Sequence, residues 1–231
     1  MSQPSPAPAP LRAAVGRRVW QGVFHGFYRS TTIDGHRVPA TGPVLLASNH
    51  TGLIDGPLVF GLAPRPAHFV VKQEMFHGFS GWVLRQMGQI PIDRSFADRT
   101  AIRTALAVLA RGGVVGVFPE GSRGRGDVAA VHAGVTFLAM ASGAPVVPVA
   151  CLGTRPDGGS ISRPPRPGNR LAVVFGDPFT LTAAPGVPRR QASKALTEQV
   201  RVTLAEHVRA SAARTGIAIY DSPPAGLEDA S

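Results

Sequence analysis

Cysteine, lysine and long apolar runs are scarce in this chain of 231 residues. Cys151 is its only cysteine, which excludes an intrachain disulfide and a cysteine-based zinc site, argues against redox chemistry and fits a reducing cytoplasm. No stretch approaches the roughly 18 uninterrupted apolar residues that a spanning helix needs, so we expect no transmembrane segment.

Several catalytic motifs are missing as well. The only lysines, Lys72 and Lys194, follow valine and serine, so the phosphate-binding pattern G-x-x-x-x-G-K-S/T cannot occur. H-E-x-x-H and the G-x-S-x-G elbow are absent, and the G-x-G-x-x-A match at residues 124–129 starts too far after its strand. Nucleotide hydrolases, zinc enzymes, serine esterases and dinucleotide-dependent enzymes therefore lack their expected machinery here.

What the chain does contain is arginine, which supplies nearly all of its formal net charge of +10. A guanidinium is a planar fork of donors that suits phosphate. The charge is compatible with nucleic acid, anionic membrane lipid or an acidic carrier, and compositional drift explains part of the excess equally well.

The sequence divides into four parts. Residues 1–10 alternate Pro with Ala and Ser and predict a disordered tail without a secretory signal. Residues 11–30 predict an amphipathic helix, residues 31–214 a single folded domain, and residues 215–231 a C-terminal tail.

The pattern in residues 11–30 allows two interpretations. Apolar residues recur every fourth position, with aromatic residues beside them and arginines around them. The helix either lies in a membrane interface with snorkelling arginines or packs on the core of its own domain. The residues concerned are Leu11, Val15, Val19, Val23 and Phe27, then Trp20, Phe24 and Tyr28, and Arg12, Arg17, Arg18 and Arg29.

The folded part alternates apolar runs with helical patterns, which predicts an α/β domain with a mostly parallel or mixed central sheet flanked by helices. Strands are expected at residues 44–48, 68–71, 89–92, 114–118, 146–151 and 171–175. Helices are expected at residues 57–62, 74–87, 96–111, 132–142 and 190–213. Ser95 and Asp98 would form a capping box for the third helix.

The run NHTGLID at residues 49–55 directly follows an apolar strand. If the chain turns at Gly52, Asp55 can accept a proton from one ring nitrogen of His50 and leave the other nitrogen as a base. The competing interpretation makes Asp55 the N-cap of the next helix and His50 a core histidine.

Two further clusters end apolar runs with charged residues. In GQIPIDR at residues 88–94, Arg94 could reach a phosphate with Asp93 beside it, although a surface ion pair is the commoner explanation. In FPEGSRGRG at residues 118–126, glycines allow backbone N–H groups to approach a ligand. Glu120 would orient a substrate hydroxyl or an arginine, or else is a solvated loop carboxylate.

Taken in order, these three clusters resemble the lysophosphatidic acid (1-acylglycerol-3-phosphate) acyltransferase family of glycerolipid acyltransferases. The run APVVPV at residues 144–149 resembles a fourth block of the family, and the resemblance spans roughly Asp34 to Phe179. Four blocks in the same order are specific, although each alone is weak.

The resemblance implies a role for each motif residue. His50 would be the general base and Asp55 its partner. The acceptor and its phosphate would be bound by Arg94, Glu120, Gly121, Ser122 and Arg123. Where the family often carries Lys or Arg before Gly134, this chain has Val-His-Ala, which leaves a phosphate contact there open.

The implied reaction moves an acyl chain from acyl-coenzyme A or acyl carrier protein to the free hydroxyl of 1-acylglycerol-3-phosphate and gives phosphatidic acid. No metal or other cofactor is implied, and the expected location is peripheral, on the cytoplasmic face of the cell membrane. Two alternatives stay open: acyl transfer to another lyso-lipid or a glycolipid, and a basic nucleic-acid-binding module, which the scattered arginines disfavour.

Overall fold

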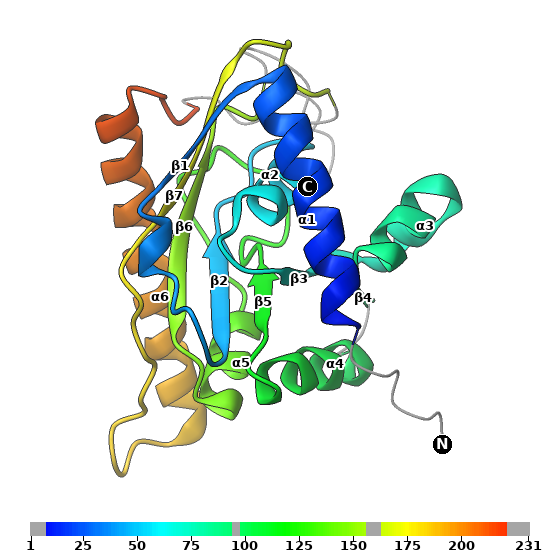
Figure 1. Ribbon diagram of the computed structural model, residues 1–231. Coiled ribbons are helices and arrows are strands. Elements are labelled where there is room, and N and C mark those ends of the chain that lie inside the picture. The colour runs from blue at the N-terminus through cyan, green and yellow to red at the C-terminus, as the bar shows by residue number, and fades with distance from the viewer. Residues whose placement is uncertain (1–7, 94–97, 156–162, 221–231) are drawn as a thin grey trace.

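The computed structural model describes residues 8–93, 98–155 and 163–220. At its centre is a seven-stranded sheet in the order β1-β7-β6-β2-β5-β3-β4 (Figure 1). Neighbouring strands are parallel except β6 and β7, so the sheet is mixed and mostly parallel, as expected from the sequence. The strands are β1 (Arg29–Ile33), β2 (Val44–Ser48), β3 (Ala67–Lys72), β4 (Ile90–Ile92), β5 (Val114–Val117), β6 (Val146–Leu152) and β7 (Arg170–Phe175).

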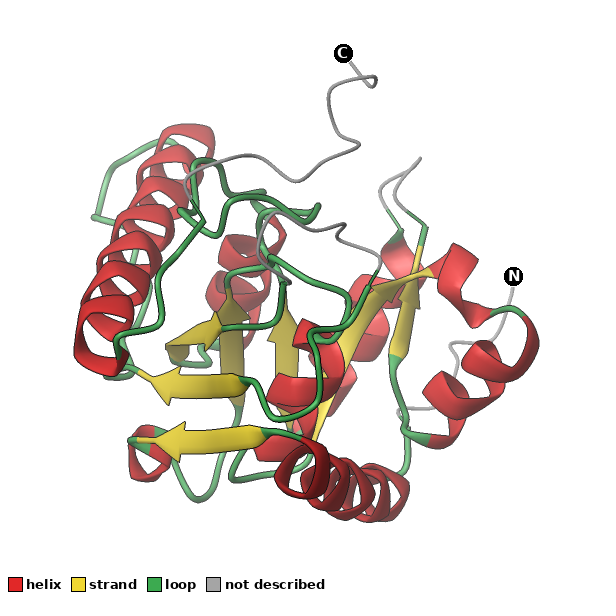
Figure 2. Ribbon diagram, turned by 90° about the horizontal axis from the view of Figure 1, so that it is seen from above, coloured by secondary structure: helices red, strands yellow, loops and turns green. Residues whose placement is uncertain are grey.

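Helices cover both faces of the sheet (Figure 2). The first two, α1 and α2, pack on one face, and α4, α5 and α6 pack on the other. The helices are α1 (Pro10–Phe27), α2 (Asp55–Leu62), α3 (Gly78–Gln86), α4 (Arg99–Ala110), α5 (Gly134–Ser142) and α6 (Arg189–Thr215), with short 3-10 helices η1 (Gly35–Arg37) and η2 (Gln73–Phe76).

The central strands read as continuous apolar runs because both of their faces are buried. Side chains of a strand alternate between the two faces. On β2, Leu45 and Ala47 therefore join the core under α4, α5 and α6, whereas Val44 and Leu46 join the core under α1 and α2.

The first helix separates the residues that the sequence placed on one stripe. Trp20, Phe24 and Tyr28 form a row of ring contacts, with centroids 5.6 and 5.9 Å apart, and Phe24 is buried. Gly16 allows close packing, since a Cβ there would lie 3.0 Å from Cγ of Met87. The i, i+4 apolar series stays largely exposed: Leu11, Val15, Val19 and Phe27. One side of α1 thus packs on the domain, while another side is apolar and uncovered.

Strand β1 was not predicted from the sequence, and the helix predicted over residues 11–30 is wrong at its end. The helix stops at Phe27, and residues Arg29 to Ile33 pair with β7 in parallel. The run RSTTI has no regular alternation of apolar residues, so only its β-branched threonines and isoleucine signal a strand.

Three other boundaries differ from the sequence prediction. The helix expected at residues 74–87 is interrupted at His77, whose extended backbone (φ −99°, ψ 154°) separates η2 from α3. Asp98 is the N-cap of α4, where it accepts from the N–H groups of Thr100 and Ala101, and is not the fourth residue of a capping box. The tail expected from residue 215 begins later, because Ile217 packs against the core. Ser95 and residues 1–7 of the tail predicted at residues 1–10 lie outside the described residues, while α1 already begins at Pro10.

Within the described parts of the chain, none of the helices has the length and apolar character needed to cross a bilayer.

Candidate active site

Three neighbouring strands bring the candidate residues to one edge of the sheet. Strands β5, β2 and β6 lie side by side and run parallel, so their carboxyl ends meet at the same edge. That edge is where open α/β sheets usually bind ligands. Residues 49–55 follow β2, residues 118–126 follow β5, and residues 153–155 follow β6.

His50 and Asp55 meet as the sequence predicted. The chain turns after β2, and Nδ1 of His50 lies 2.7 Å from Oδ2 of Asp55. The same oxygen accepts from the N–H groups of Thr51 and Gly52, at 2.5 and 2.8 Å. Ile54, not Asp55, is the N-cap of α2, so the competing interpretation of Asp55 as a helix cap is wrong.

The Asp55 side chain is fully buried, yet it is ionised at neutral pH. Burial is the largest influence and by itself raises the pKa of this carboxyl. The hydrogen bond from the His50 ring and the electrostatic attraction to it, with the donors Thr154 and Gly52, outweigh burial and bring the pKa below its ordinary value. An ionised carboxylate only accepts hydrogen bonds, so Nδ1 of His50 carries a proton toward Asp55, and Nε2 is the ring nitrogen that could accept one.

Glu120 supports the backbone of the histidine. Its Oε1 accepts the N–H of His50 at 2.8 Å, and the carbonyl of His50 accepts the N–H of Gly124 at 2.8 Å. Burial raises the pKa of Glu120 from 4.5 to about 7, and the hydrogen bond from His50 only partly opposes this effect. The loop after β5 therefore holds the dyad residue from both of its peptide groups.

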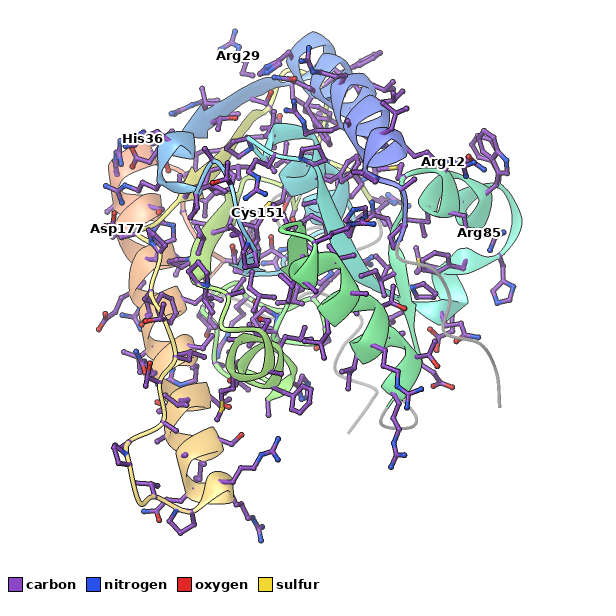
Figure 3. The ribbon with its side chains drawn as sticks, turned by 60° about the horizontal axis from the view of Figure 1, so that its bottom comes forward. Arg12, Arg29, His36, Arg85, Cys151 and Asp177 are labelled. Atoms are coloured by element: carbon purple, nitrogen blue, oxygen red, sulfur yellow. The ribbon has the colours of Figure 1, made fainter. Side chains whose placement is uncertain are left out.

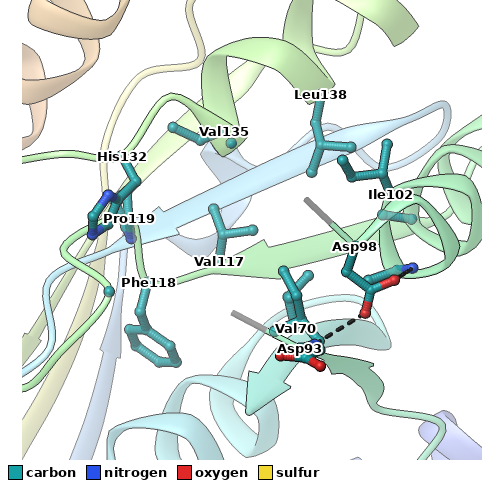
Figure 4. A pocket seen from close by; sticks show the side chains of 15 residues that line it. Val70, Asp93, Asp98, Ile102, Val117, Phe118, Pro119, His132, Val135 and Leu138 are labelled. Carbon is teal, nitrogen blue, oxygen red and sulfur yellow. Dashed lines mark hydrogen bonds between the residues drawn. The ribbon is translucent and has the colours of Figure 1, made fainter. Parts of the chain in front are cut away.

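An apolar cavity of about 490 Å³ adjoins the dyad through Phe118 (Figure 4). The Phe118 ring stacks on the His50 ring, with centroids 4.3 Å apart and planes at 24°. The cavity lies between the ends of β3, β4 and β5 and the helices α4 and α5. Asp93 and Asp98 form its polar end, where Oδ2 of Asp98 accepts the N–H of Asp93 at 3.0 Å.

Of the other predicted site residues, one lines the cavity, two do not, and one is outside the described residues. Gly121 lines the cavity, and its φ of +74° together with the nearby His132 ring favours glycine there. Ser122 is exposed and Arg123 is partly buried, and neither lines the cavity. Arg94 lies outside the described residues; its neighbour Asp93 is at the cavity.

Sequence reasoning missed the contribution of β6. Thr154 donates its hydroxyl hydrogen bond to Oδ1 of Asp55, and the Cys151 thiol contacts the same oxygen at 3.5 Å. The side chain of Asn49 accepts the N–H of Cys151 at 2.7 Å and donates to its carbonyl at 3.1 Å. Only the polar Thr after an apolar strand could have drawn attention to this segment.

In the described ranges, no cluster of three or more His, Cys, Asp or Glu side chains is arranged to hold a metal ion. The expectation of catalysis without a metal stays a prediction. The chemistry that the described groups do support is proton abstraction by an imidazole beside an apolar cavity.

Comparison with known proteins places the chain in a family. A 1-acyl-sn-glycerol-3-phosphate acyltransferase of Bacillus subtilis (strain 168) is 28% identical over 171 residues, covering 73% of this chain and 83% of that protein. The chloroplastic enzyme BAT2 of Brassica napus, with the same name, is 25% identical over 143 residues, covering 59% of this chain and 41% of that protein.

The fold is also that of a solved structure. The crystal structure of the 1-acyl-sn-glycerophosphate (LPA) acyltransferase PlsC from Thermotoga maritima matches with a TM-score of 0.59 and 22% identity, covering 87% of this chain and 79% of that one. The family model described as "Acyltransferase" matches residues 30–152, from β1 to the end of β6. With this match over more than half of its length, the chain belongs to the acyltransferase family.

Proposed function

We propose that this acyltransferase moves a fatty acyl chain from a thioester, acyl-coenzyme A or acyl carrier protein, to the free hydroxyl of 1-acylglycerol-3-phosphate. The product would be phosphatidic acid, for phospholipid biosynthesis. The observation that carries the proposal is the hydrogen bond of 2.7 Å between His50 and buried Asp55, beside an apolar cavity. The names of the bacterial and plant relatives support this acceptor.

In the proposed reaction Nε2 of His50 removes the proton from the acceptor hydroxyl. The oxygen attacks the thioester carbonyl and forms a tetrahedral oxyanion, which collapses as the carbon–sulfur bond breaks. The proton held by His50 then passes to the leaving sulfur, so the products are an ester and a thiol. Asp55 stays ionised throughout and stabilises the imidazolium that forms in between.

The oxyanion needs hydrogen-bond donors, and the loop after β5 was the source expected from its glycines. Two of its N–H groups are engaged within the protein: Gly121 donates to Phe118 at 3.1 Å, and Gly124 donates to His50 at 2.8 Å. We therefore propose that other donors at this edge of the sheet serve the oxyanion. The apolar walls of the cavity suit an acyl chain, with its carbonyl end toward the Phe118 side.

The test of the mechanism is acyl transfer by His50→Ala, followed by mass detection of the product. General-base catalysis contributes about 10²- to 10⁴-fold, so turnover should fall by at least that range. His36→Ala, a change at an exposed histidine, is the matched control and should keep wild-type turnover. Wild-type rates from pure, folded His50→Ala protein would remove the mechanism.

Another lyso-lipid or a glycolipid is the alternative acceptor. Replacing Arg94 distinguishes the two acceptors. Loss of a guanidinium that binds phosphate should reduce acyl transfer only to a phosphorylated acceptor. Several lyso-acceptors and both thioester donors should therefore be offered to wild type and Arg94→Ala. Equal loss with phosphorylated and unphosphorylated acceptors would contradict phosphate binding by Arg94.

We also propose peripheral attachment to the cytoplasmic face of an anionic membrane through α1 and α3. Both helices expose apolar side chains: Leu11, Val15, Val19 and Phe27 on α1, and Phe79 and Trp82 on α3. The two α3 rings stack, with centroids 5.9 Å apart. Arg12 and Arg85 lie at the same edge of the molecule (Figure 3), where each adds about 1 kcal/mol of attraction to an anionic surface.

Flotation with vesicles of phosphatidylcholine and phosphatidylglycerol tests this attachment. The wild type should float at low salt and bind less at high salt, because part of the attraction is electrostatic. Val19→Glu on α1 should reduce flotation, since it places a charge in the lipid-facing series. Val202→Glu on α6 adds the same charge to the opposite side of the sheet and should float like wild type. Equal flotation of both variants would contradict the proposed face.

A further inference from the structure

The two oxygens of the Asp55 carboxylate are held by different parts of the chain. Oδ2 receives local donors, namely the His50 ring and the N–H groups that follow it. Oδ1 faces β6 and the residues that follow it: it contacts the thiol of Cys151 on β6 at 3.5 Å and accepts from the hydroxyl of Thr154. Because Asp55 is fully buried, water cannot replace either set.

Thr154 is itself held firmly against the turn that carries the dyad. It is fully buried and follows Gly153, whose φ is +82°. A Cβ on Gly52 would lie 2.6 Å from the carbonyl oxygen of Thr154, so glycine at position 52 lets the two segments touch. The two hydrogen bonds between Asn49 and the Cys151 backbone hold the exit of β6 beside that of β2.

The proton of the Thr154 hydroxyl has a defined direction. An ionised carboxylate offers no proton, so Thr154 must donate to Asp55. The oxygen of Thr154 also lies 3.0 Å from Oγ1 of Thr51. Because the hydrogen of Thr154 is used on Asp55, Thr51 is the donor in this second hydrogen bond. The result is an ordered chain of hydroxyl donors ending on the carboxylate. The Cys151 thiol is a weak donor and cannot replace the Thr154 hydroxyl.

We infer that Thr154 is a positioning residue, whose hydroxyl holds Oδ1 of Asp55 so that Oδ2 remains aimed at Nδ1 of His50. This inference rests on the proposed role of His50 as the base. Without the hydroxyl, the carboxylate is held firmly at one oxygen only and can rotate about its Cβ–Cγ bond. The imidazole then loses its orientation, although the surfaces that bind donor and acceptor are unchanged.

Two pairs of variants test the hydroxyl. Thr154→Val keeps the volume of the side chain and removes the donor, while Thr154→Ser keeps the donor. If the valine protein does not fold, Thr154→Ala against Thr154→Ser gives the same comparison. Thr136→Val is the matched control, because Thr136 is also fully buried and bonded, at 2.9 Å to Thr197, on α5 and away from the dyad.

The measurements are kcat and KM for acyl transfer, with thermal unfolding to verify the fold. A hydrogen bond to a charged group suggests a loss in kcat of roughly 10- to 100-fold for Thr154→Val, with KM within about twofold of wild type. Thr154→Ser should stay within about threefold of wild type, and Thr136→Val should match it. Wild-type kcat in folded Thr154→Val or Thr154→Ala, or equal losses in the serine and hydroxyl-free proteins, would overturn the inference.

His50→Ala, measured in parallel, separates this inference from the proposed mechanism. Loss of turnover in His50→Ala together with wild-type kcat in Thr154→Val overturns only the role of Thr154. Wild-type turnover in His50→Ala overturns the mechanism itself, whatever Thr154→Val does.

Discussion

Replacing Glu120 by Gln should change how the stability of the folded protein depends on pH. Burial raises the pKa of this carboxyl from 4.5 to about 7, and the negative charges of Asp127 and Asp55 add to the shift. The hydrogen bond from the N–H of His50 opposes it in part. Gln can accept the same N–H but cannot ionise, so the variant keeps the contact and removes the titration.

The direction and size of the effect follow from the two pKa values. Between pH 4.5 and about 7, the folded protein keeps a proton on Glu120 that the unfolded chain has released. The stability from this proton is therefore fully present below about pH 4.5 and is lost as the pH rises through about 7. A pKa difference of one unit corresponds to about 1.4 kcal/mol. Because the unfolded chain already begins to release this proton below pH 5, only part of the full loss falls between pH 5 and pH 8, and this part is about 2.5 kcal/mol of the free energy of unfolding.

Urea unfolding at several pH values measures this difference. The free energy of unfolding of wild type minus that of Glu120→Gln should fall by about 2.5 kcal/mol from pH 5 to pH 8. Glu198→Gln is the control: a hydrogen bond from Arg201 lowers the pKa of Glu198, so this exposed carboxyl titrates below the window. A difference between wild type and Glu120→Gln that stays constant across the window would refute the reasoning.

Three other changes have defined outcomes. Gly52→Ala places a Cβ 2.6 Å from the Thr154 carbonyl oxygen, so it should lower the free energy of unfolding by about 1–3 kcal/mol and reduce kcat; an unchanged urea midpoint and kcat would contradict the close approach. Phe118→Leu removes the ring stacked on His50 and should lower kcat by roughly 2- to 10-fold, from the worth of an aromatic pair. Ala105→Leu narrows the cavity and should reduce kcat/KM for long-chain thioesters more than for short-chain ones; an equal effect on both would show that the cavity does not hold the acyl chain.

The contact between His50 and Asp55 could be anticipated from local signals, although these left the helix-cap interpretation open and the two roles came from the family resemblance. A run of apolar residues predicts the buried strand, Gly52 permits the turn, and five positions separate His50 from Asp55. The mixed sheet also followed from local patterns, since apolar runs buried on both faces alternate with helical periods.

Features that depend on distant pairing could not be predicted in the same way. Thr154 and Asp55 are 99 positions apart, and nothing in the sequence around either residue indicates that they touch. Strand β1 has only one buried side chain, at Ser30, so its place in the sheet depends on pairing with β7 and not on an apolar pattern. Asp98 was assigned to the wrong cap position because an N-cap is defined by the backbone N–H groups that its side chain accepts. The spacing of residues in the sequence locates a helix end only to within one or two positions.

The separation between Asp55 and Thr154 has a consequence for the newly made chain. As the protein leaves the ribosome, the turn with His50 emerges well before β6, and until then Oδ1 of Asp55 has no hydroxyl to meet. An amino-terminal fragment that ends before Val146 would carry the whole histidine motif but would lack Thr154 and β6, the strand that pairs with β2 and β7. We therefore expect full turnover only once β6 has paired with β2 and brought Thr154 to the carboxylate.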